Sequence, residues 1–549
     1  MARFLRHSAG NYIIFTAIMK HLFLAATAVF FSVALLAQTP APKPTPAPAK
    51  PADGKPADTK PAKPRDPALD KPVGVAPGRH YPVSAKQQNL NLTVHFRQLQ
   101  KGEVLLAHYY ANQNRVLDTA DIDANGNAVF QADSAAPGGI YIVVMPSKRH
   151  FEIILAEEQK FKVDVSDTNK IIETIKVEGS KENIAFYEHQ RFMNEQGQKV
   201  EPYRTLLDKA KATGNKDSVE LMTKKITAID SVVKKYKTDY QAKYPDFFMT
   251  KVLKLMEEPI AVPLAQCPKK PDGTIDSSYN YWNYRNHYWD GMDWRDERLL
   301  RTPVYYNKMK FWVEKVVPQH PDTLAAQMNW LINQTAQSDE LYRYTVSYLT
   351  YYFESSKIMG FDAVFVSIVE NNHALRKCWW LTEENNKKIV DRAKQLKFTL
   401  IGAQAVNLFL QDSSGKTVEL GKIQADYTIL VFWDPTCSHC KVEIPELKVY
   451  YDSLRAAGVS VEVYAIYSEL DYPTWKKYIK EHKHTWKDVS GRDAQELGTA
   501  KYYYDVFSTP TLYVLDKAKK IIGKRLDPKG LRTVLDRRIE MDKKAGGQQ

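Results

Sequence analysis

The chain has 549 residues, a formal net charge of +13 and a hydrophobic content of 44%. This length is typical of about three or four domains, and the apolar content is sufficient for more than one buried core. The Lys and Arg residues are spread along helical patterns and a linker and accompany no nucleic-acid-binding motif. This distribution argues against nucleic acid as a partner.

The N-terminal segment, residues 1–37, is predicted to be a secretory signal peptide. An apolar run, Leu22 to Leu36, follows the basic residue Lys20, and Met19 is an alternative start. The run is short for a membrane span, but Leu35 stands where signal cleavage prefers a small residue, so an uncleaved anchor stays open. We therefore expect the protein in the periplasm or cell envelope, which is an oxidising compartment.

Two regions without chemical motifs follow. Residues 38–85 are rich in Pro, Ala and Lys, which favours an extended polyproline spacer, so we assign them to a linker. Residues 86–180 contain short apolar runs such as Ile140 to Val144, separated by turn clusters such as Pro137-Gly138-Gly139. This pattern predicts an antiparallel β-domain.

Residues 181–396 are predicted to form an all-α domain, because apolar residues recur with helical spacing. One helix face of this kind carries Leu324, Met328, Leu331 and Ile332. Residues 279–294 are dense in aromatic side chains, for which packing between helices is favoured over a ligand or partner groove. Cys267 and Cys378 either pair with each other or are separate buried thiols.

Residues 397–549 alternate strand and helix patterns, which predicts a mixed α/β domain. Cys437 and Cys440 stand between a buried strand pattern, Thr428 to Phe432, and a helical pattern. Two thiols separated by two residues at a helix N-terminus can close a reversible disulfide, and the helix dipole stabilises a thiolate there. The pair therefore predicts a redox site, with Cys437 as the exposed nucleophile and Cys440 as the resolving thiol.

These residues resemble a known family. Phe432-Trp433, the Cys437-Ser438-His439-Cys440 motif and Ser508-Thr509-Pro510 together resemble the thioredoxin fold. Glu443 and Pro445 resemble the TlpA/ResA-like branch of exported thiol-disulfide oxidoreductases. The β-rich and helical regions are similar to two uncharacterised domains that precede such modules in envelope proteins of Gram-negative bacteria.

The resemblance implies roles for further residues. Glu443 is expected to tune the cysteines in place of the buried acid that thioredoxin carries at the strand position of Val431; a plain surface carboxylate is the alternative. Thr509 is expected to offer backbone hydrogen bonds to an extended substrate, next to a cis peptide bond before Pro510. Trp433 is expected to pack beside the cysteine pair at the substrate-binding site, or to be ordinary core.

The direction of electron flow depends on two opposing signals. The resemblance and Glu443 indicate a reductant, whereas a protonated His439 favours the thiolate and makes the couple more oxidising. We expect an exported oxidoreductase that reduces cysteine-containing envelope proteins through its own Cys437–Cys440 disulfide, without another cofactor or a metal. A membrane-bound thiol protein is the expected electron donor.

Three alternatives compete with this interpretation. In the first, the chain is an envelope scaffold whose thioredoxin-like domain only docks partners. In the second, Cys437 and Cys440 bind zinc with His482 and His484. Two histidines one residue apart diverge, however, and the spacing matches no common zinc finger. The third, a peroxidase, needs a Thr three residues before its reactive Cys, where this chain has Asp434.

Overall fold

The computed structural model describes residues 77–80 and 87–546. The predicted signal peptide and nearly all of the predicted linker lie outside these residues. The chain divides into two compact units, the first ending at Val316 and the second continuing from Val317. This division falls inside the region predicted as one helical domain, residues 181–396. Within the described part of the chain, no helix is long and apolar enough to cross a membrane.

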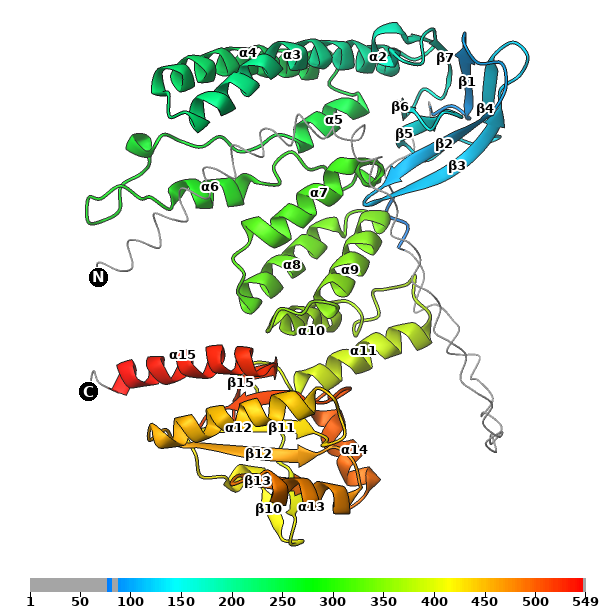
Figure 1. Ribbon diagram of the computed structural model, residues 1–549. Coiled ribbons are helices and arrows are strands. Elements are labelled where there is room, and N and C mark those ends of the chain that lie inside the picture. Colours follow the sequence, from blue (N-terminus) through cyan, green and yellow to red (C-terminus); the bar gives the residue numbers. More distant parts are fainter. Residues whose placement is uncertain (1–76, 81–86, 547–549) are drawn as a thin grey trace, which may run out of the picture. The chain divides into compact units, whose positions relative to one another are not determined.

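The first unit begins with two four-stranded β-sheets, which have the strand orders β4-β1-β7-β8 and β3-β2-β5-β6 (Figure 1). The β-rich prediction is confirmed, but β1 and β7 pair in parallel. Apolar alternation reports which face of a strand is buried and not the direction of its neighbour, so the parallel pair could not be predicted from the pattern. The strands are β1 (Asn91–Phe96), β2 (Glu103–Tyr110), β3 (Gln113–Asp121), β4 (Asn127–Gln131), β5 (Gly139–Val144), β6 (His150–Leu155), β7 (Lys160–Val165) and β8 (Lys176–Glu178).

Helices make up the rest of the first unit. Ser180 caps the long helix α3 by accepting a hydrogen bond from the Asn183 amide, and α4 packs along α3 (Figure 1). The helices are α2 (Ile171–Thr174), α3 (Lys181–Ala212), α4 (Lys216–Lys243), α5 (Phe248–Leu255), α6 (Tyr279–His287) and α7 (Pro303–Phe311), with short turns η4 (Leu264–Gln266), η5 (Glu297–Arg301) and η6 (Trp312–Val316).

The aromatic run at residues 279–294 contributes mainly to the core. Tyr284, Tyr288 and Trp289 are buried, and their successive ring centroids lie 5.5 and 5.3 Å apart. Trp282 is the member that remains exposed. The contacts favour the packing interpretation over a groove.

The second unit begins with four helices: α8 (Pro321–Thr335), α9 (Asp339–Glu354), α10 (Phe361–Asn371) and α11 (Glu383–Lys397). The apolar face predicted for α8 is fully buried. Helix α10 packs against α8, α9 and α11. Cys378 of this unit and Cys267 of the first unit are both free, buried thiols, and burial raises the pKa of Cys378 to about 12.

The C-terminal α/β domain contains a seven-stranded sheet with the order β10-β9-β13-β12-β11-β14-β15. Central β11 is buried at every residue, and its side chains alternate between two cores. Val431 and Trp433 face the core that contains residues of α12, α13 and α15, whereas Leu430 and Phe432 face the core that contains residues of α14. This arrangement confirms the mixed α/β prediction.

The predicted strand Thr428 to Phe432 lies within β11, whereas β13 was not predicted because it is short and begins with two charged residues. The strands are β9 (Phe409–Asp412), β10 (Thr417–Glu419), β11 (Tyr427–Trp433), β12 (Val461–Tyr467), β13 (Lys487–Ser490), β14 (Thr511–Leu515) and β15 (Ile521–Leu526). The helices are η7 (Leu420–Lys422), α12 (Cys440–Ala456), α13 (Tyr472–Glu481), α14 (Ala494–Tyr503) and α15 (Pro528–Gly546).

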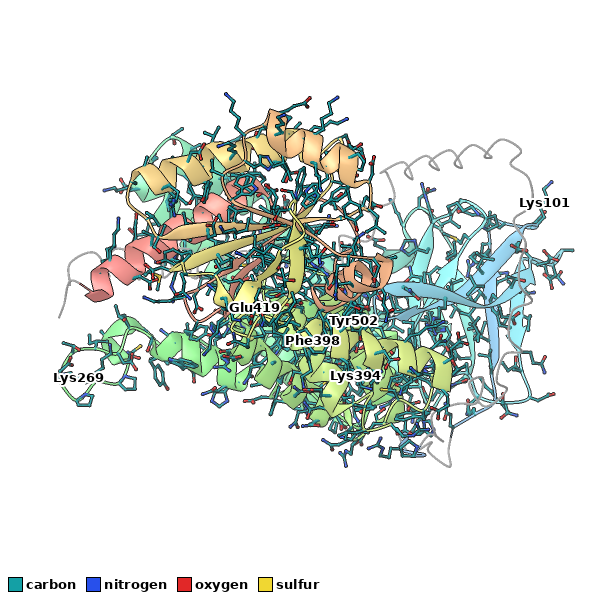
Figure 2. All side chains as sticks on the ribbon, turned by 90° about the horizontal axis from the view of Figure 1, so that it is seen from below. Lys101, Lys269, Lys394, Phe398, Glu419 and Tyr502 are labelled. Atoms are coloured by element: carbon teal, nitrogen blue, oxygen red, sulfur yellow. The ribbon has the colours of Figure 1, made fainter. Side chains whose placement is uncertain are left out.

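Ion pairs and hydrogen bonds join helix α11 to the α/β domain. Arg392 pairs with the buried carboxylate of Asp505, which also pairs with Arg525. The Gln395 amide donates to the Tyr502 carbonyl at 3.1 Å, and Figure 2 shows Tyr502 beside the C-terminal end of α11. A second ion pair joins Lys524 of β15 to Asp362 of α10. The contacts of Arg392 and Gln395 hold α11 against the segment that precedes Thr509.

Candidate functional site

The two cysteines lie where β11 ends and α12 begins. The Asp434 carbonyl accepts a hydrogen bond from the Cys437 amide at 3.2 Å, and its carboxylate accepts one from the Thr436 amide at 3.0 Å. The Cys437 carbonyl accepts from the Lys441 amide at 3.1 Å, which is the spacing of an α-helix. The regular helix begins at Cys440. Cys437 therefore lies in the turn that leads into α12.

Cys437 has a free and partly exposed thiol. Its Sγ donates to the Thr509 carbonyl at 3.3 Å, and the Thr509–Pro510 peptide bond is cis, as predicted. Burial opposes ionisation of this thiol. Hydrogen bonds from Thr509 and from the backbone amides of His439 and Cys440 outweigh burial and lower the pKa of Cys437. This thiol therefore ionises more readily than that of an ordinary cysteine.

Cys440 has the opposite surroundings. Its side chain is 1% exposed and belongs to the core formed by β11, β12 and helices α12, α13 and α15. Burial raises the pKa of the Cys440 thiol to about 12, and a negative charge on Cys437 acts in the same direction. The cysteine pair is thus chemically asymmetric.

The two residues predicted to tune the pair differ in exposure. His439 is exposed and Glu443 is half-buried in the first turn of α12. Burial raises the pKa of Glu443, the Asp527 carboxylate raises it further, and His439 acts in the opposite direction. Asp527 itself accepts a hydrogen bond from the Gly530 amide at 2.6 Å at the start of α15. Glu443 therefore has another acid beside it, and its effect on the cysteines stays a prediction.

Three family models match the chain. Residues 401–524 match the model described as the AhpC/TSA family. Residues 90–186 and 250–397 match two models described as domains of unknown function, DUF4369 and DUF5106. Only the C-terminal match therefore carries a functional description.

Curated relatives match the same C-terminal region. Thiol-disulfide oxidoreductase ResA of Bacillus cereus is 27% identical over 124 residues, which cover 23% of this chain and 68% of the relative. ResA of Bacillus subtilis is 27% identical over 121 residues, which cover 22% of this chain and 64% of the relative. The chain thus spans about two thirds of the length of these relatives.

Solved structures also match. A domain of a possible thiol-disulfide isomerase from Cytophaga hutchinsonii is 38% identical, with 26% of this chain and 97% of that chain covered and a TM-score of 0.24. A thioredoxin-like protein from Bacteroides caccae is 20% identical, with 50% of this chain and 98% of that chain covered and a TM-score of 0.39.

The C-terminal domain is similar to the thioredoxin-like thiol-disulfide oxidoreductases. Its sheet, its CxxC pair at the start of α12 and its cis-Pro loop opposite Cys437 are the parts that carry this similarity. The turn before Cys437 has Asp434 where a peroxidase of this fold would need Thr.

Trp433 of the thioredoxin-like domain requires a correction. Its side chain is fully buried, so it does not form part of a substrate-binding surface. The ring lies in the same core as Cys440, with the Tyr478 ring at 5.1 Å and the Tyr467 ring at 6.5 Å. The sequence placed Trp433 beside the pair correctly, but it could not show that β11 is covered on both faces. Of its two predicted roles, the core role fits.

The cis-Pro loop presents a residue that the sequence analysis missed. Phe507 is 76% exposed, and the Arg392 guanidinium of α11 lies 5.4 Å from the centroid of its ring. Arg392 also holds Asp505, two residues before Phe507, with one hydrogen bond of 3.1 Å. An aromatic residue close to Thr509-Pro510 was the one local signal, since Arg392 comes from a distant helix. Phe507 therefore adds an exposed apolar surface to the cis-Pro loop, whose Thr509 carbonyl contacts Cys437.

The two histidines of the zinc alternative have other partners in the thioredoxin-like domain. His484 Nδ1 is 3.0 Å from Asp488 Oδ2, and both side chains are buried. The His482 ring stacks on Tyr478 with centroids 3.7 Å apart. Among the described residues, no group of three or more His, Cys, Asp and Glu side chains could hold a metal ion.

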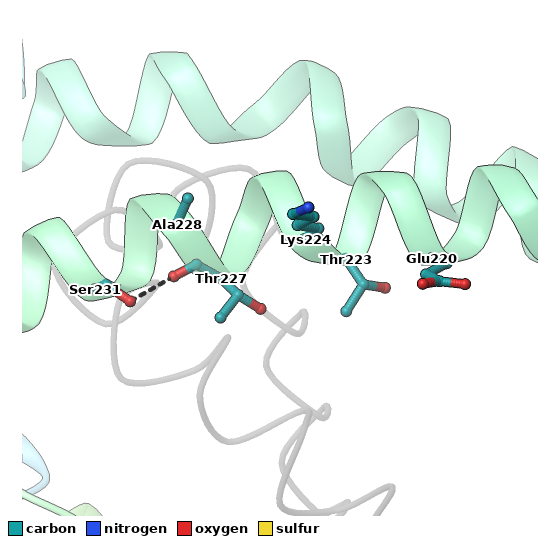
Figure 3. Close-up of a pocket in the computed structure, with 6 residues that line it drawn as sticks. All are labelled: Glu220, Thr223, Lys224, Thr227, Ala228 and Ser231. Atoms are coloured by element: carbon teal, nitrogen blue, oxygen red, sulfur yellow. Dashed lines mark hydrogen bonds between the residues drawn. The ribbon is translucent and has the colours of Figure 1, made fainter.

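One surface hollow lies on α4 of the first unit (Figure 3). Its described lining comes from this single helix, and the Ser231 hydroxyl donates to the Thr227 carbonyl at 2.9 Å within it. The lining residues are Glu220, Thr223, Lys224, Thr227, Ala228 and Ser231. Side chains from one helix face do not converge on a ligand, so we assign this hollow no function.

Proposed function

We propose that this protein is an exported thiol-disulfide oxidoreductase that reduces cysteine-containing proteins of the cell envelope. The proposal is carried by the asymmetry of the CxxC pair. Cys437 is partly exposed and has a lowered pKa, whereas Cys440 is buried and has a raised pKa. Because the thiolate is the attacking species in disulfide exchange, this asymmetry favours Cys437 as the nucleophile and Cys440 as the resolving thiol.

The reaction has two exchange steps. First, the Cys437 thiolate attacks a client disulfide, so that a mixed disulfide forms and one client sulfur leaves as a thiolate. Cys440 then gives up its proton and attacks Cys437, which breaks the mixed disulfide and releases the second client sulfur. Two electrons pass to the client, and the enzyme keeps a Cys437–Cys440 disulfide. A membrane-bound thiol protein returns the pair to the dithiol, and no further cofactor is required.

The cis-Pro loop is the proposed client surface. The Thr509 carbonyl lies against Cys437, and exposed Phe507 offers an apolar contact next to it. An extended client segment on this loop would place its disulfide at Cys437. Cellular location rests on the apolar run Leu22 to Leu36 and on the resemblance to exported oxidoreductases.

A trapping experiment on the full chain tests the exchange mechanism. Cys440→Ser should accumulate a mixed disulfide with an oxidised protein client, identified by mass spectrometry as a bond to Cys437. The matched control, Cys437→Ser with Cys440→Ser, should trap nothing. Failure to trap a client, or trapping through Cys267 or Cys378, would overturn the proposal.

The reduction potential of the pair tests the direction of electron flow. A value near the roughly −270 mV of thioredoxin would support a reductant. A value near about −120 mV, typical of a strong disulfide donor, would instead make the protein an oxidant.

A further inference from the structure

The C-terminal end of α14 has a backbone conformation that usually requires glycine. The Asp505 amide donates to the Tyr502 carbonyl at 3.2 Å, and the Val506 amide donates to the Lys501 carbonyl at 2.9 Å. These two hydrogen bonds form a Schellman motif, in which one residue after the helix adopts a left-handed conformation and is most often glycine. That residue here is Asp505, with a φ of 51°. An acid therefore occupies a position where the backbone alone favours glycine.

The side chain of Asp505 explains why an acid stands there. Its carboxylate is fully buried and is shared by two arginines. Arg392 of α11 donates to it with both terminal nitrogens, Nη2 at a distance of 3.1 Å, and Arg525 of β15 pairs with it as well. A buried carboxylate is tolerated when it is paired in this way. Asp505 thus joins the end of α14 to α11 and to β15.

The strand that carries Arg525 is also adjusted for this contact. The register of β15 against β14 shifts between Leu512 and Tyr513, which leaves Arg525 as an extra residue of β15. Arg525 has a φ of 51°, and a bulge residue in the left-handed region redirects its side chain. Two separate departures from regular backbone geometry therefore bring charged side chains to one buried ion-pair cluster.

Helix α11 makes further contacts with the same end of α14. The Gln395 side-chain amide donates to the Tyr502 carbonyl at 3.1 Å, and the rings of Phe398 and Tyr503 lie 4.8 Å apart. Phe398 and Tyr502 mark this junction in Figure 2. Residues three positions apart lie on one face of a helix, so Arg392 and Gln395 hold α14 from the same face of α11.

The cis-Pro loop, residues 506–510, leads from this anchored point to the redox site. It connects Asp505 to the first residue of β14 and carries two groups beside the cysteines. Phe507 is 76% exposed, and the Thr509 carbonyl accepts a hydrogen bond from Cys437 Sγ at 3.3 Å. So short a segment has little reach, so its two fixed ends determine where these groups lie. The contacts of Asp505 therefore bear on the surroundings of the nucleophile.

We propose that α11, through Arg392, positions the cis-Pro loop at Cys437 and is thereby part of the redox site. This inference rests on the proposed exchange function and extends it to a region that so far has no role, since residues 250–397 match DUF5106 and α11 is the last helix of that region. Arg392 is a positioning residue. It acts through Asp505 on the placement of Thr509, and it holds the ring of Phe507 at 5.4 Å for protein clients.

Asp505→Gly separates this role from ordinary helix capping. Glycine keeps the left-handed end of α14 but removes the carboxylate that binds Arg392. Arg392→Met removes the same ion pair from the other side and keeps the length of the side chain. Asp505→Asn is the conservative variant, because Asn tolerates the left-handed region and its oxygen still accepts a hydrogen bond from Arg392. The control is Arg376→Met, which breaks an exposed ion pair with Glu383 in the first turn of the same helix.

Two measurements on the reduced full chain report the effect. Asp505→Gly and Arg392→Met should each move the pH midpoint of Cys437 alkylation upward and slow alkylation by iodoacetamide at pH 7 by about two- to fivefold, since Thr509 no longer stabilises the thiolate fully. Each should also raise the KM for insulin, used as an oxidised protein client, by about threefold. Asp505→Asn should lie closer to the unmodified protein than Asp505→Gly, and Arg376→Met should change neither quantity.

The double variant Asp505→Gly with Arg392→Met should be no worse than the more affected single variant, because both substitutions remove one shared link. Denaturant unfolding of each variant shows that the fold is retained. The inference is overturned if Asp505→Gly leaves both the alkylation midpoint and the KM unchanged, or if the effects of the two substitutions add. An unmodified protein that reduces no client would instead remove the proposed function, whereas the alkylation midpoint needs no client and still decides the positioning role.

Discussion

The surroundings of the two cysteines of the CxxC pair differ in whether they stabilise a negative charge on sulfur. On the exposed side, Cys437 is close to hydrogen-bond donors from Thr509, His439 and Cys440, which favour its thiolate. On the buried side, Cys440 lies in an aromatic core that favours its neutral thiol. Identical side chains three positions apart thus gain opposite reactivity from burial and local donors.

The largest effect is expected from the exposed side. Cys437→Ser should reduce protein disulfide reductase activity to the uncatalysed background, because no other exposed thiol is found in the described part of the chain. Insulin turbidity in the presence of dithiothreitol measures this loss. Cys267→Ser is the control and should retain full activity; substantial turnover by Cys437→Ser would contradict the exposed-side assignment.

Selective alkylation compares the two thiols directly. In the reduced protein at pH 7, iodoacetamide should modify Cys437 at least about a hundredfold faster than Cys440, because a lowered pKa provides thiolate and a raised pKa removes it. The alkylation rate at Cys437 should rise with pH, and the pH at its midpoint should lie below 9, the pKa of an ordinary cysteine, because the pKa of Cys437 is lowered. Peptide mapping by mass spectrometry measures both rates, and equal labelling would refute the contrast.

A smaller change should follow from the loss of one donor on the exposed side. Thr509→Val keeps the backbone carbonyl but removes the hydroxyl, which should raise the pKa of Cys437 and slow its alkylation at pH 7 by about two- to fivefold. Thr533→Val, at an exposed position of α15, should change nothing. An unchanged pH profile in Thr509→Val would mean that the hydroxyl does not stabilise the thiolate.

The smallest effect concerns the client surface. Phe507→Ala should lower the affinity for protein clients by about twofold, because part of one aromatic contact is lost, while the reaction with a small aromatic disulfide stays normal. The free energy of unfolding should change by less than about 0.5 kcal/mol, since the ring is exposed. The measurement is the KM for an oxidised protein client. Val449→Ala, which also removes an exposed apolar side chain, is the control and should leave this KM unchanged. A parallel loss with the small disulfide would exclude a client-binding role.

Local sequence patterns were sufficient to predict the elements that surround Cys437. The strand, the cysteine spacing and the Thr509-Pro510 motif lie within short stretches of chain, and the structure has the elements where these patterns put them. The regular helix starts only at Cys440, because the Cys437 amide donates to the Asp434 carbonyl and so forms a turn before the helix.

The buried side could not be inferred in the same way. His484 was considered as a zinc ligand, and Asp488 attracted no attention, since both stand at a short charged strand that gives little apolar signal. The place of Asp488 in the domain depends on the order of strands in the sheet, in which β12 alone separates β13 from β11. Burial of Trp433 depends on helices packed on both faces, which no local pattern reports.

The ion pairs between α10, α11 and the thioredoxin-like domain set a limit on how the protein can be shortened. The family match starts at residue 401, but Asp505 and Lys524 find partners in Arg392 and Asp362, upstream of that point. A fragment cut at the family boundary would leave the nearly buried Lys524 ammonium without its carboxylate and would release Phe507 from Arg392. Biochemical work on the isolated redox module therefore needs a fragment that starts before α10.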